Sequence, residues 1–230
     1  MSYDGLRRLV PAWLRRQIFH FEVLIEEALT AYSASLPPVQ RVLDAGAGEG
    51  RYRDYFKRQL YTGIDLGVGD KGWDYSGLDC VANLLELPFR TASFDAFVSV
   101  VTLEHVTDPS AAIAEMARVA RPSATLFLVV PHEWEVHQHP HDYFRFTRYG
   151  ITMLLEKHGW QIERLSPGGG YFRLLSRRLM NGLQFLPAWL MPFAAILVVP
   201  AALVVGLLDP LDTKKDYTLG YICWAKRKSI

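Results

Sequence analysis

A glycine-rich run, Val42–Tyr52 (VLDAGAGEGRY), has residue types and spacing that suggest ligand chemistry. It leaves an apolar strand-like segment and turns through Gly46, Gly48 and Gly50 towards an expected helix. Glycines are needed where the backbone turns sharply and approaches a ligand without a Cβ atom in the way. A tight turn without a ligand is the simpler alternative. The dinucleotide fingerprint Gly-x-Gly-x-x-Gly is disfavoured, because its third glycine would fall on Arg51.

The next strand-like run, Tyr61–Asp65, ends in an acidic residue. A carboxylate about 20 residues beyond such glycines can accept hydrogen bonds from both hydroxyls of a ribose. An exposed aspartate in a turn is the alternative. The pairing of Asp65 with the glycine loop favours the ribose site.

Five segments together closely resemble the class I methyltransferases, in the large branch whose members carry an LPF loop and an LEH segment. They are Asp44-x-Gly46-x-Gly48-x-Gly50, Asp65, Asn83–Phe89, Phe94–Ser99 and Leu103–Val106. The resemblance covers roughly residues 40–165 in the right order. It implies a Rossmann-like fold and S-adenosylmethionine as the cofactor.

By this resemblance, Gly46 and Gly48 shape the pocket for the methionine moiety, Asp44 lies at its floor, and Asp65 holds the ribose. The remaining expected cofactor contacts are Leu66, Asn83 and Leu84, of which the last two flank the adenine. Position 83 is usually aspartate in this branch. The amide oxygen of Asn83 can accept a hydrogen bond but carries no charge, so we expect a weaker hold on the adenine amino group.

Two histidines are candidate catalytic bases. Transfer of a methyl group from a sulfonium needs little machinery, because the leaving group is neutral and in-line positioning supplies much of the effect. Oxygen and nitrogen acceptors can also need a base. His105, just past the fourth strand, could serve or could close that loop structurally, and His141 is the second candidate.

The segment Pro131–Thr147 holds four of the seven histidines. Their spacing fits no closed metal-binding motif, so no metal is predicted. The segment resembles one in methyltransferases of bacterial polysaccharide and lipid-glycan clusters. That resemblance implies that His141, Asp142, Tyr143 and Arg145 offer hydrogen bonds to a sugar, phosphate or carboxylate. A polar loop with a buried aromatic anchor is the alternative.

Strand-like runs alternate with helical ones, which predicts a doubly wound α/β fold with a mostly parallel sheet. The strands are expected at residues 41–45, 61–65, 79–82, 96–101, 125–130, 160–165 and 219–226. The family resemblance implies seven strands, with the seventh antiparallel between the fifth and sixth. We expect an N-terminal helical cap at residues 1–38 with one helix at residues 12–35. A methyltransferase domain is expected at 39–171 and 213–230, and an apolar helical insertion at 172–212.

The composition of the 230-residue chain limits its partners and compartment. A net charge of +1 argues against a nucleic-acid binder. The two cysteines show no metal or disulfide pattern, which suits a reducing compartment. Arginines at positions 7, 8, 15 and 16 interrupt any signal-peptide core, so we expect a cytoplasmic protein.

Leu179–Leu208 contains no charged residue, and it exceeds the roughly 20 apolar residues that span a bilayer. Its prolines, Pro187, Pro192 and Pro200, favour two helices that dip into the membrane and return. Arginines precede the run and lysines follow it, which suits anionic cytoplasmic headgroups. We therefore expect peripheral or monotopic attachment at the inner face of the membrane. A dimer interface and a buried extra helical layer are the alternatives.

An insertion leaving the carboxyl end of the sixth strand would start at the cofactor edge. The prediction is therefore methyl transfer from S-adenosylmethionine to a lipid-linked glycan, another membrane lipid or a quinone. The alternatives are a soluble small-molecule methyltransferase that uses the insertion to form a homodimer, and a non-catalytic adaptor with the cofactor fold.

Overall fold

The computed structural model describes residues 10–69 and 72–228. The chain divides into two compact units. A sheet unit comprises Glu27–Ser166 and Gly220–Ile230, and a helical unit comprises Met1–Glu26 and Pro167–Leu219. The expected N-terminal cap is thus shared between them, because residues 27–38 lie in the sheet unit.

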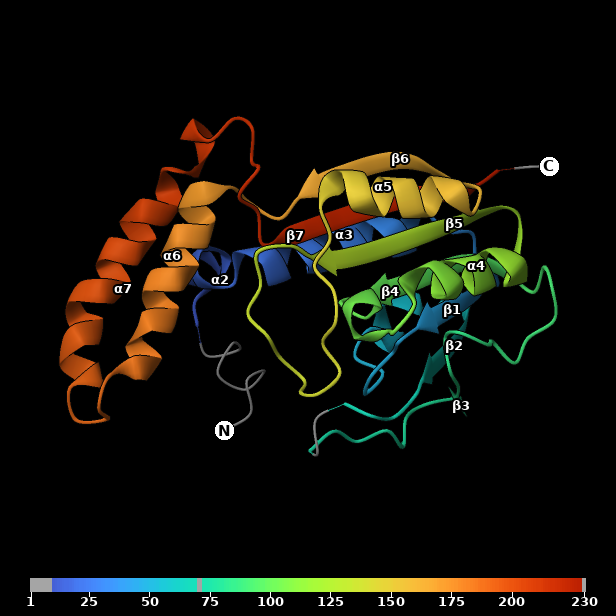
Figure 1. Ribbon diagram of the computed structural model, residues 1–230, viewed down its shortest axis with the longest axis horizontal. Coiled ribbons are helices and arrows are strands. Elements are labelled where there is room, and N and C mark those ends of the chain that lie inside the picture. The colour runs from blue at the N-terminus through green and yellow to red at the C-terminus, as the bar shows by residue number, and fades with distance from the viewer. Residues whose placement is uncertain (1–9, 70–71, 229–230) are drawn as a thin grey trace. The chain divides into compact units, whose positions relative to one another are not determined.

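The sheet has seven strands in the order β3-β2-β1-β4-β5-β7-β6 (Figure 1). Their bounds are β1 Arg41–Ala45, β2 Leu60–Asp65, β3 Cys80–Val81, β4 Phe94–Val100, β5 Ala120–Pro131, β6 Trp160–Pro167 and β7 Gly220–Arg227. The strands from β3 to β5 pair in parallel, whereas β7 runs antiparallel to β5. In Figure 1, β6 points the same way as β5. The fold predicted from the sequence is therefore confirmed.

The core explains why the central strands read as continuous apolar runs. In β4, Phe97 and Val98 are both fully buried although they point to opposite faces of the sheet. The ring of Phe97 meets that of Trp160 edge-on at 5.6 Å. Helices must therefore cover both faces.

Capping side chains start two of the helices that cover the sheet. Asp108 caps α4 (Pro109–Val119) by accepting from the Ala111 amide at 2.9 Å. Thr147 caps α5 (Arg148–Lys157) in the same way. In Figure 1, α4 and α5 lie in front of the sheet and α3 (His20–Ser35) lies behind it.

Tyr32 ties the second half of α3 to the sheet unit. Its buried hydroxyl lies 3.1 Å from the carbonyl oxygen of Phe97, to which it donates, and 2.9 Å from the hydroxyl of Thr125. Its ring packs edge-on against Trp224 at 5.4 Å. This face of the sheet is thus closed by an element that precedes the first strand.

Two helix predictions were wrong in detail. The glycine loop leads into the single 3₁₀ turn η1 (Arg53–Phe56) rather than a full helix. Residues 51–59, between the loop and β2, are otherwise turns and bends. The helix expected at residues 12–35 is interrupted at Phe19 (φ −108°, ψ 45°), which separates α2 (Ala12–Ile18) from α3.

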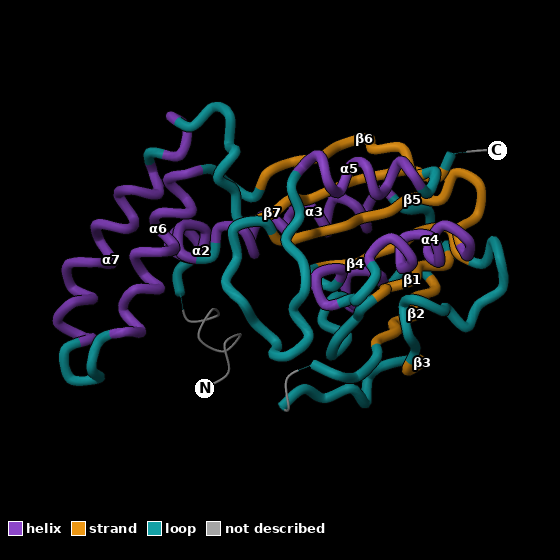
Figure 2. The backbone as a smooth tube through the Cα atoms, viewed as in Figure 1, coloured by secondary structure: helices purple, strands orange, loops and turns teal. Residues whose placement is uncertain are grey.

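The helical unit contains α6 (Tyr171–Gly182), the short turn η3 (Leu183–Phe185), α7 (Met191–Leu207) and η4 (Asp209–Leu211). Figure 2 shows α6 and α7 as two neighbouring helices joined by a short turn. Pro192 lies in the first turn of α7, where proline is tolerated, whereas Pro200 lies inside that helix.

Candidate active site

The glycine loop adopts a backbone that side chains would obstruct. Gly46 and Gly48 have φ of +91° and +54°. A Cβ atom on Gly46 would lie 2.1 Å from the side chain of Thr102, and one on Gly48 would lie 3.1 Å from the ring of Trp73. Both the left-handed φ and the close packing explain why glycine stands at these positions.

Asp65 lies at the carboxyl end of β2, beside this loop. One carboxylate oxygen accepts from the amide of Gly48 at 3.0 Å, and the other accepts from the amide of Gly67 at 2.8 Å. The carboxylate therefore fixes the glycine loop. The structure brings Asp65 and the loop together as the sequence predicted, while its contact with a ribose stays a prediction.

Asp44 is a buried carboxylate next to the loop. Tyr61 donates to its Oδ2 at 2.6 Å, whereas Oδ1 has no hydrogen-bond partner among the described residues. Burial raises the pKa of Asp44 to about 7. An unpartnered buried oxygen beside a glycine turn fits a cationic ligand such as S-adenosylmethionine, which carries a sulfonium and an ammonium group.

The residues expected to flank the adenine, Asn83 and Leu84, lie in the segment after β3. The side-chain oxygen of Asn83 accepts from the amide of Leu85 at 3.0 Å, which makes a local turn. Asn83 is exposed, Leu84 is buried and Leu66 is half exposed. The contacts predicted for these three residues stay predictions.

The turn after β4 carries the LEH segment as the 3₁₀ turn η2 (Leu103–His105). Nδ1 of His105 is hydrogen-bonded to the backbone carbonyl of His141. Nε2 of His105 lies 3.7 Å from a carboxylate oxygen of Glu104. Burial lowers the pKa of His105 and raises that of Glu104 to about 8. His105 is thus held within a half-buried polar cluster.

The loop between β5 and α5 has no helix or strand over most of its length (Figure 2). Asp142 and Arg145 form a two-pronged ion pair within it, at 2.6 and 2.8 Å. Arg145 also donates to the carbonyls of Trp134 and Glu135, at 3.0 and 2.7 Å. The same pairing holds the pKa of Asp142 far below its usual range. These two side chains therefore shape the loop, and their predicted contact with the acceptor stays untested.

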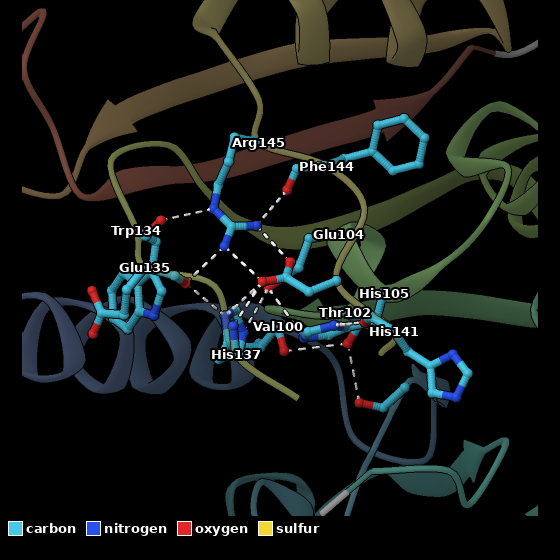
Figure 3. A network of polar contacts seen from close by, with 12 residues as sticks. Val100, Thr102, Glu104, His105, Trp134, Glu135, His137, His141, Phe144 and Arg145 are labelled. Carbon is cyan, nitrogen blue, oxygen red and sulfur yellow. Dashed lines mark hydrogen bonds and ion pairs between the residues drawn. The ribbon is translucent and has the colours of Figure 1, made fainter. Parts of the chain in front are cut away.

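The backbone anchors this loop to η2. The amides of Tyr143 and Phe144 donate to the carbonyl oxygen of Glu104, at 2.8 and 3.3 Å. Figure 3 shows Arg145, Glu104, His137 and His105 gathered in one polar network. Two segments far apart in the sequence are thus joined at the carboxyl edge of the sheet.

Tyr143 is exposed at this edge and His141 is partly exposed. Nδ1 of His141 lies 2.9 Å from the hydroxyl of Tyr143, and the Tyr143 side chain is 44% exposed. In Figure 3 the His141 ring points away from the Glu104 cluster. Of the two predicted bases, His141 is therefore the more accessible.

Sequence reasoning missed two members of the network, Glu104 and His137. The sequence pattern gives Glu104 only as part of the LEH segment, and His137 only as one of four histidines in its loop. Burial of an acidic residue between two imidazoles is decided by how the loops after β4 and β5 fold together. No spacing rule reveals that arrangement.

Comparison with known proteins agrees with this geometry. Residues 43–128 match the family model described as "Methyltransferase domain". The chain is 35% identical over 135 residues to a demethylmenaquinone methyltransferase of Roseiflexus sp. (strain RS-1), which covers 54% of this chain and 53% of that protein. It is 30% identical over 161 residues to a ubiquinone/menaquinone biosynthesis C-methyltransferase of Burkholderia mallei, which covers 63% and 62%. The chain therefore matches between half and two thirds of these relatives.

Solved structures agree on the fold. Phosphoethanolamine N-methyltransferase 2 of Haemonchus contortus, in complex with S-adenosyl-L-methionine, aligns with a TM-score of 0.55 at 17% identity. The alignment covers 89% of this chain and 52% of that one. The sheet unit thus has the Rossmann-like fold of these structures, and its residues 43–128 match a methyltransferase domain, whose cofactor is S-adenosylmethionine.

Proposed function

We propose that this protein transfers a methyl group from S-adenosylmethionine to an acceptor that resides in a membrane. The observation that carries the proposal is the combination of a methyltransferase domain with a helical unit that exposes a long apolar helix. Met191–Leu211 has a mean hydropathy of 2.5, and 11% of its most apolar window is buried. Length and composition suit contact with a bilayer.

The exposed side chains of α7 support this proposal. Phe193, Ile196 and Leu197 are 65%, 69% and 75% exposed, and Val204 on the next turns is 60% exposed. Contiguous apolar surface of this kind marks a membrane or protein contact in soluble proteins. The described part of the helix buries only Ala202 and Gly206.

Buried polar contacts help to hold the helical unit together, while α7 keeps most of its apolar side chains exposed. Asp209 accepts from the backbone amides of Gly170 and Arg173, at 3.0 and 3.1 Å, and pairs with Lys215 at 2.6 Å. Arg177 pairs with Glu22 at 3.0 Å. A Cβ atom on Gly206 would lie 3.0 Å from the Arg173 side chain, so small residues let α7 approach α6.

The sheet topology favours a segment that enters the membrane and returns on the same side. The chain leaves β6 at Pro167 and rejoins the same sheet at Gly220, where β7 pairs with β5. A single full crossing would place β7 on the opposite side of the membrane from β5. We therefore propose monotopic attachment.

The acceptor class is proposed from this attachment together with the matched relatives. Their names identify menaquinone and ubiquinone precursors as acceptors, so an isoprenoid quinone is the first candidate and a lipid-linked glycan the second. When bound, S-adenosylmethionine supplies an electrophilic methyl group. Asp65 and Asp44 would hold the cofactor, and the loop carrying His141 would position the acceptor.

Labelled S-adenosylmethionine, incubated with the protein and with bacterial membrane lipids, tests the proposal. We expect the label in the organic phase, in a product that co-migrates with a methylated quinone or lipid-linked glycan. Label that enters only water-soluble small molecules would contradict the membrane acceptor and favour a soluble methyltransferase. If the protein does not bind S-adenosylmethionine at all, the remaining explanation is a non-catalytic adaptor with the cofactor fold.

His141→Ala is expected to lower turnover on the order of 10²-fold for a hydroxyl acceptor, with cofactor affinity unchanged. Its imidazole is the accessible one at this edge, so it can take the acceptor proton. Single-turnover rates and calorimetric titration with S-adenosylmethionine separate the two effects. His139→Ala, an exposed histidine of the same loop, is the control. Normal turnover of both His141→Ala and His105→Ala would show that the reaction needs no histidine base.

A further inference from the structure

Three potential metal ligands from two loops converge at the carboxyl edge of the sheet. Glu104 and His105 come from η2 and His137 from the loop after β5, and Figure 3 shows their side chains directed towards one another. One ligand atom from each lies within 4.8 Å of the other two. A carboxylate oxygen of Glu104 lies 3.7 Å from Nε2 of His105 and 3.8 Å from Nε2 of His137.

The carboxylate at the centre of this cluster lacks a hydrogen-bond donor among the residues that the structure describes. Glu104 is 0% exposed, and neither of its side-chain oxygens has a hydrogen-bond partner among the described residues. Nε2 of His105 is likewise buried without such a partner. Leaving buried polar groups unsatisfied is costly, so an additional group is expected between them.

The two imidazoles are oriented as metal ligands. Nδ1 of His105 faces the carbonyl oxygen of His141, and Nδ1 of His137 lies 3.1 Å from the carbonyl oxygen of Glu135 and 3.3 Å from the Asp142 carboxylate. These oxygens can only accept, so each Nδ1 carries the hydrogen. Each Nε2 then presents a lone pair towards Glu104. Such outer hydrogen bonds are typical of histidines that bind metals.

We propose that Glu104, His105 and His137 bind a zinc ion. One carboxylate and two neutral imidazoles form a zinc donor set that leaves a fourth position open. Zinc bonds of about 2.0–2.2 Å at tetrahedral angles place ligand atoms about 3.3–3.5 Å apart. In this structure the two imidazoles lie 3.7 and 3.8 Å from the carboxylate, and all three ligand atoms lie within 4.8 Å of one another. Small side-chain movements would close the site. Magnesium, which prefers oxygen ligands, does not suit it.

The bound ion would join η2 to the loop after β5. Without the ion, the amides of Tyr143 and Phe144 hold the loop against η2, and the ion pair between Asp142 and Arg145 shapes the loop itself. A metal bond to His137 adds a link that comes earlier in the loop. The site would therefore fix the segment that carries His141, and it requires no particular acceptor.

Zinc binding by the full chain tests this inference. We expect the protein, stripped with a chelator and dialysed against zinc, to retain one ion per chain by elemental analysis. Cobalt should give the visible absorption of a tetrahedral site. His137→Ala and Glu104→Gln should each weaken zinc binding at least on the order of 10-fold, because second-shell changes alone cost 10–100-fold. His139→Ala should bind as the unaltered chain does.

Limited proteolysis gives a second readout that does not depend on activity. Zinc should slow cleavage within residues 132–141, and His137→Ala should abolish that protection. The inference is overturned if no stoichiometric zinc binds, or if both variants retain it at full affinity. A protonated Glu104 would then be what satisfies the cluster. Titration of the same samples with S-adenosylmethionine distinguishes a lost metal site from a lost cofactor site.

Discussion

Replacing Asp65 with alanine is expected to weaken S-adenosylmethionine binding by at least on the order of 10²-fold. The carboxylate would accept hydrogen bonds from two ribose hydroxyls, each worth about 1.5–3 kcal/mol when the acceptor is charged. A loss of about 3 kcal/mol corresponds to more than a hundredfold in the dissociation constant. Isothermal titration calorimetry measures the change directly.

Asp65 also holds the glycine loop through the amides of Gly48 and Gly67. A second variant, Gly48→Val, therefore tests the pocket independently, since its side chain would enter the space at the loop and strain a φ of +54°. Asp54→Ala is the matched control, because that carboxylate is exposed on η1. Thermal unfolding must show that the variants fold. Folded Asp65→Ala protein with unchanged affinity would disprove the ribose assignment.

The double substitution Phe193→Asp and Leu197→Asp is expected to release the protein from vesicles, lowering its partition coefficient at least on the order of 10²-fold. An aspartate at the centre of a membrane helix costs about 2.5–3.5 kcal/mol. Both side chains are exposed on α7, so the substitutions leave the packing of the helical unit intact. Flotation with vesicles containing anionic lipid measures the partition.

Matched substitutions on the sheet unit control for the added charge. Val81→Asp and Met153→Asp replace side chains that are 68% and 64% exposed, and they should leave vesicle binding unchanged. Binding of the unaltered chain should fall only partly with salt, because apolar burial is screened far less than charge. A chain that ignores vesicles and forms a soluble dimer through α7 would refute the membrane proposal and establish the interface instead.

Residues 177–208 can be deleted and the ends joined by a short Gly-Ser bridge. This variant separates cofactor binding by the sheet unit from access to a membrane acceptor through the helical unit. We expect the shortened chain to bind S-adenosylmethionine, because β6 and β7 remain, and to fail on membrane acceptors. The contacts of Arg177 with Glu22, and of Gly206 with Arg173, show that the deletion also opens the helical unit. Loss of cofactor binding on deletion would show that the sheet unit depends on the helical one.

Local sequence determined most of the fold. The apolar runs and the caps at Asp108 and Thr147 each act over a few residues, so the order of the strands and helices could be predicted. The glycine loop and Asp65 were also identified correctly as neighbours, because in a parallel sheet the carboxyl ends of adjacent strands share an edge. The position of β7 between β5 and β6 followed from the family resemblance.

Tertiary structure alone decided which side chains meet at the carboxyl edge of the sheet, after β4 and β5. The family resemblance predicts Asp142 and Arg145 as substrate ligands, and that contact stays a prediction. Only the structure shows that the loop brings their side chains within 2.6 Å of each other, where they form an ion pair. Glu104 reads as an ordinary polar residue, yet the folding of two loops buries it between His105 and His137. Such burial depends on contacts between distant segments, and no short-range pattern encodes it. The apolar run after residue 179 was evident in the sequence, whereas the exposure of α7 was visible only in the structure.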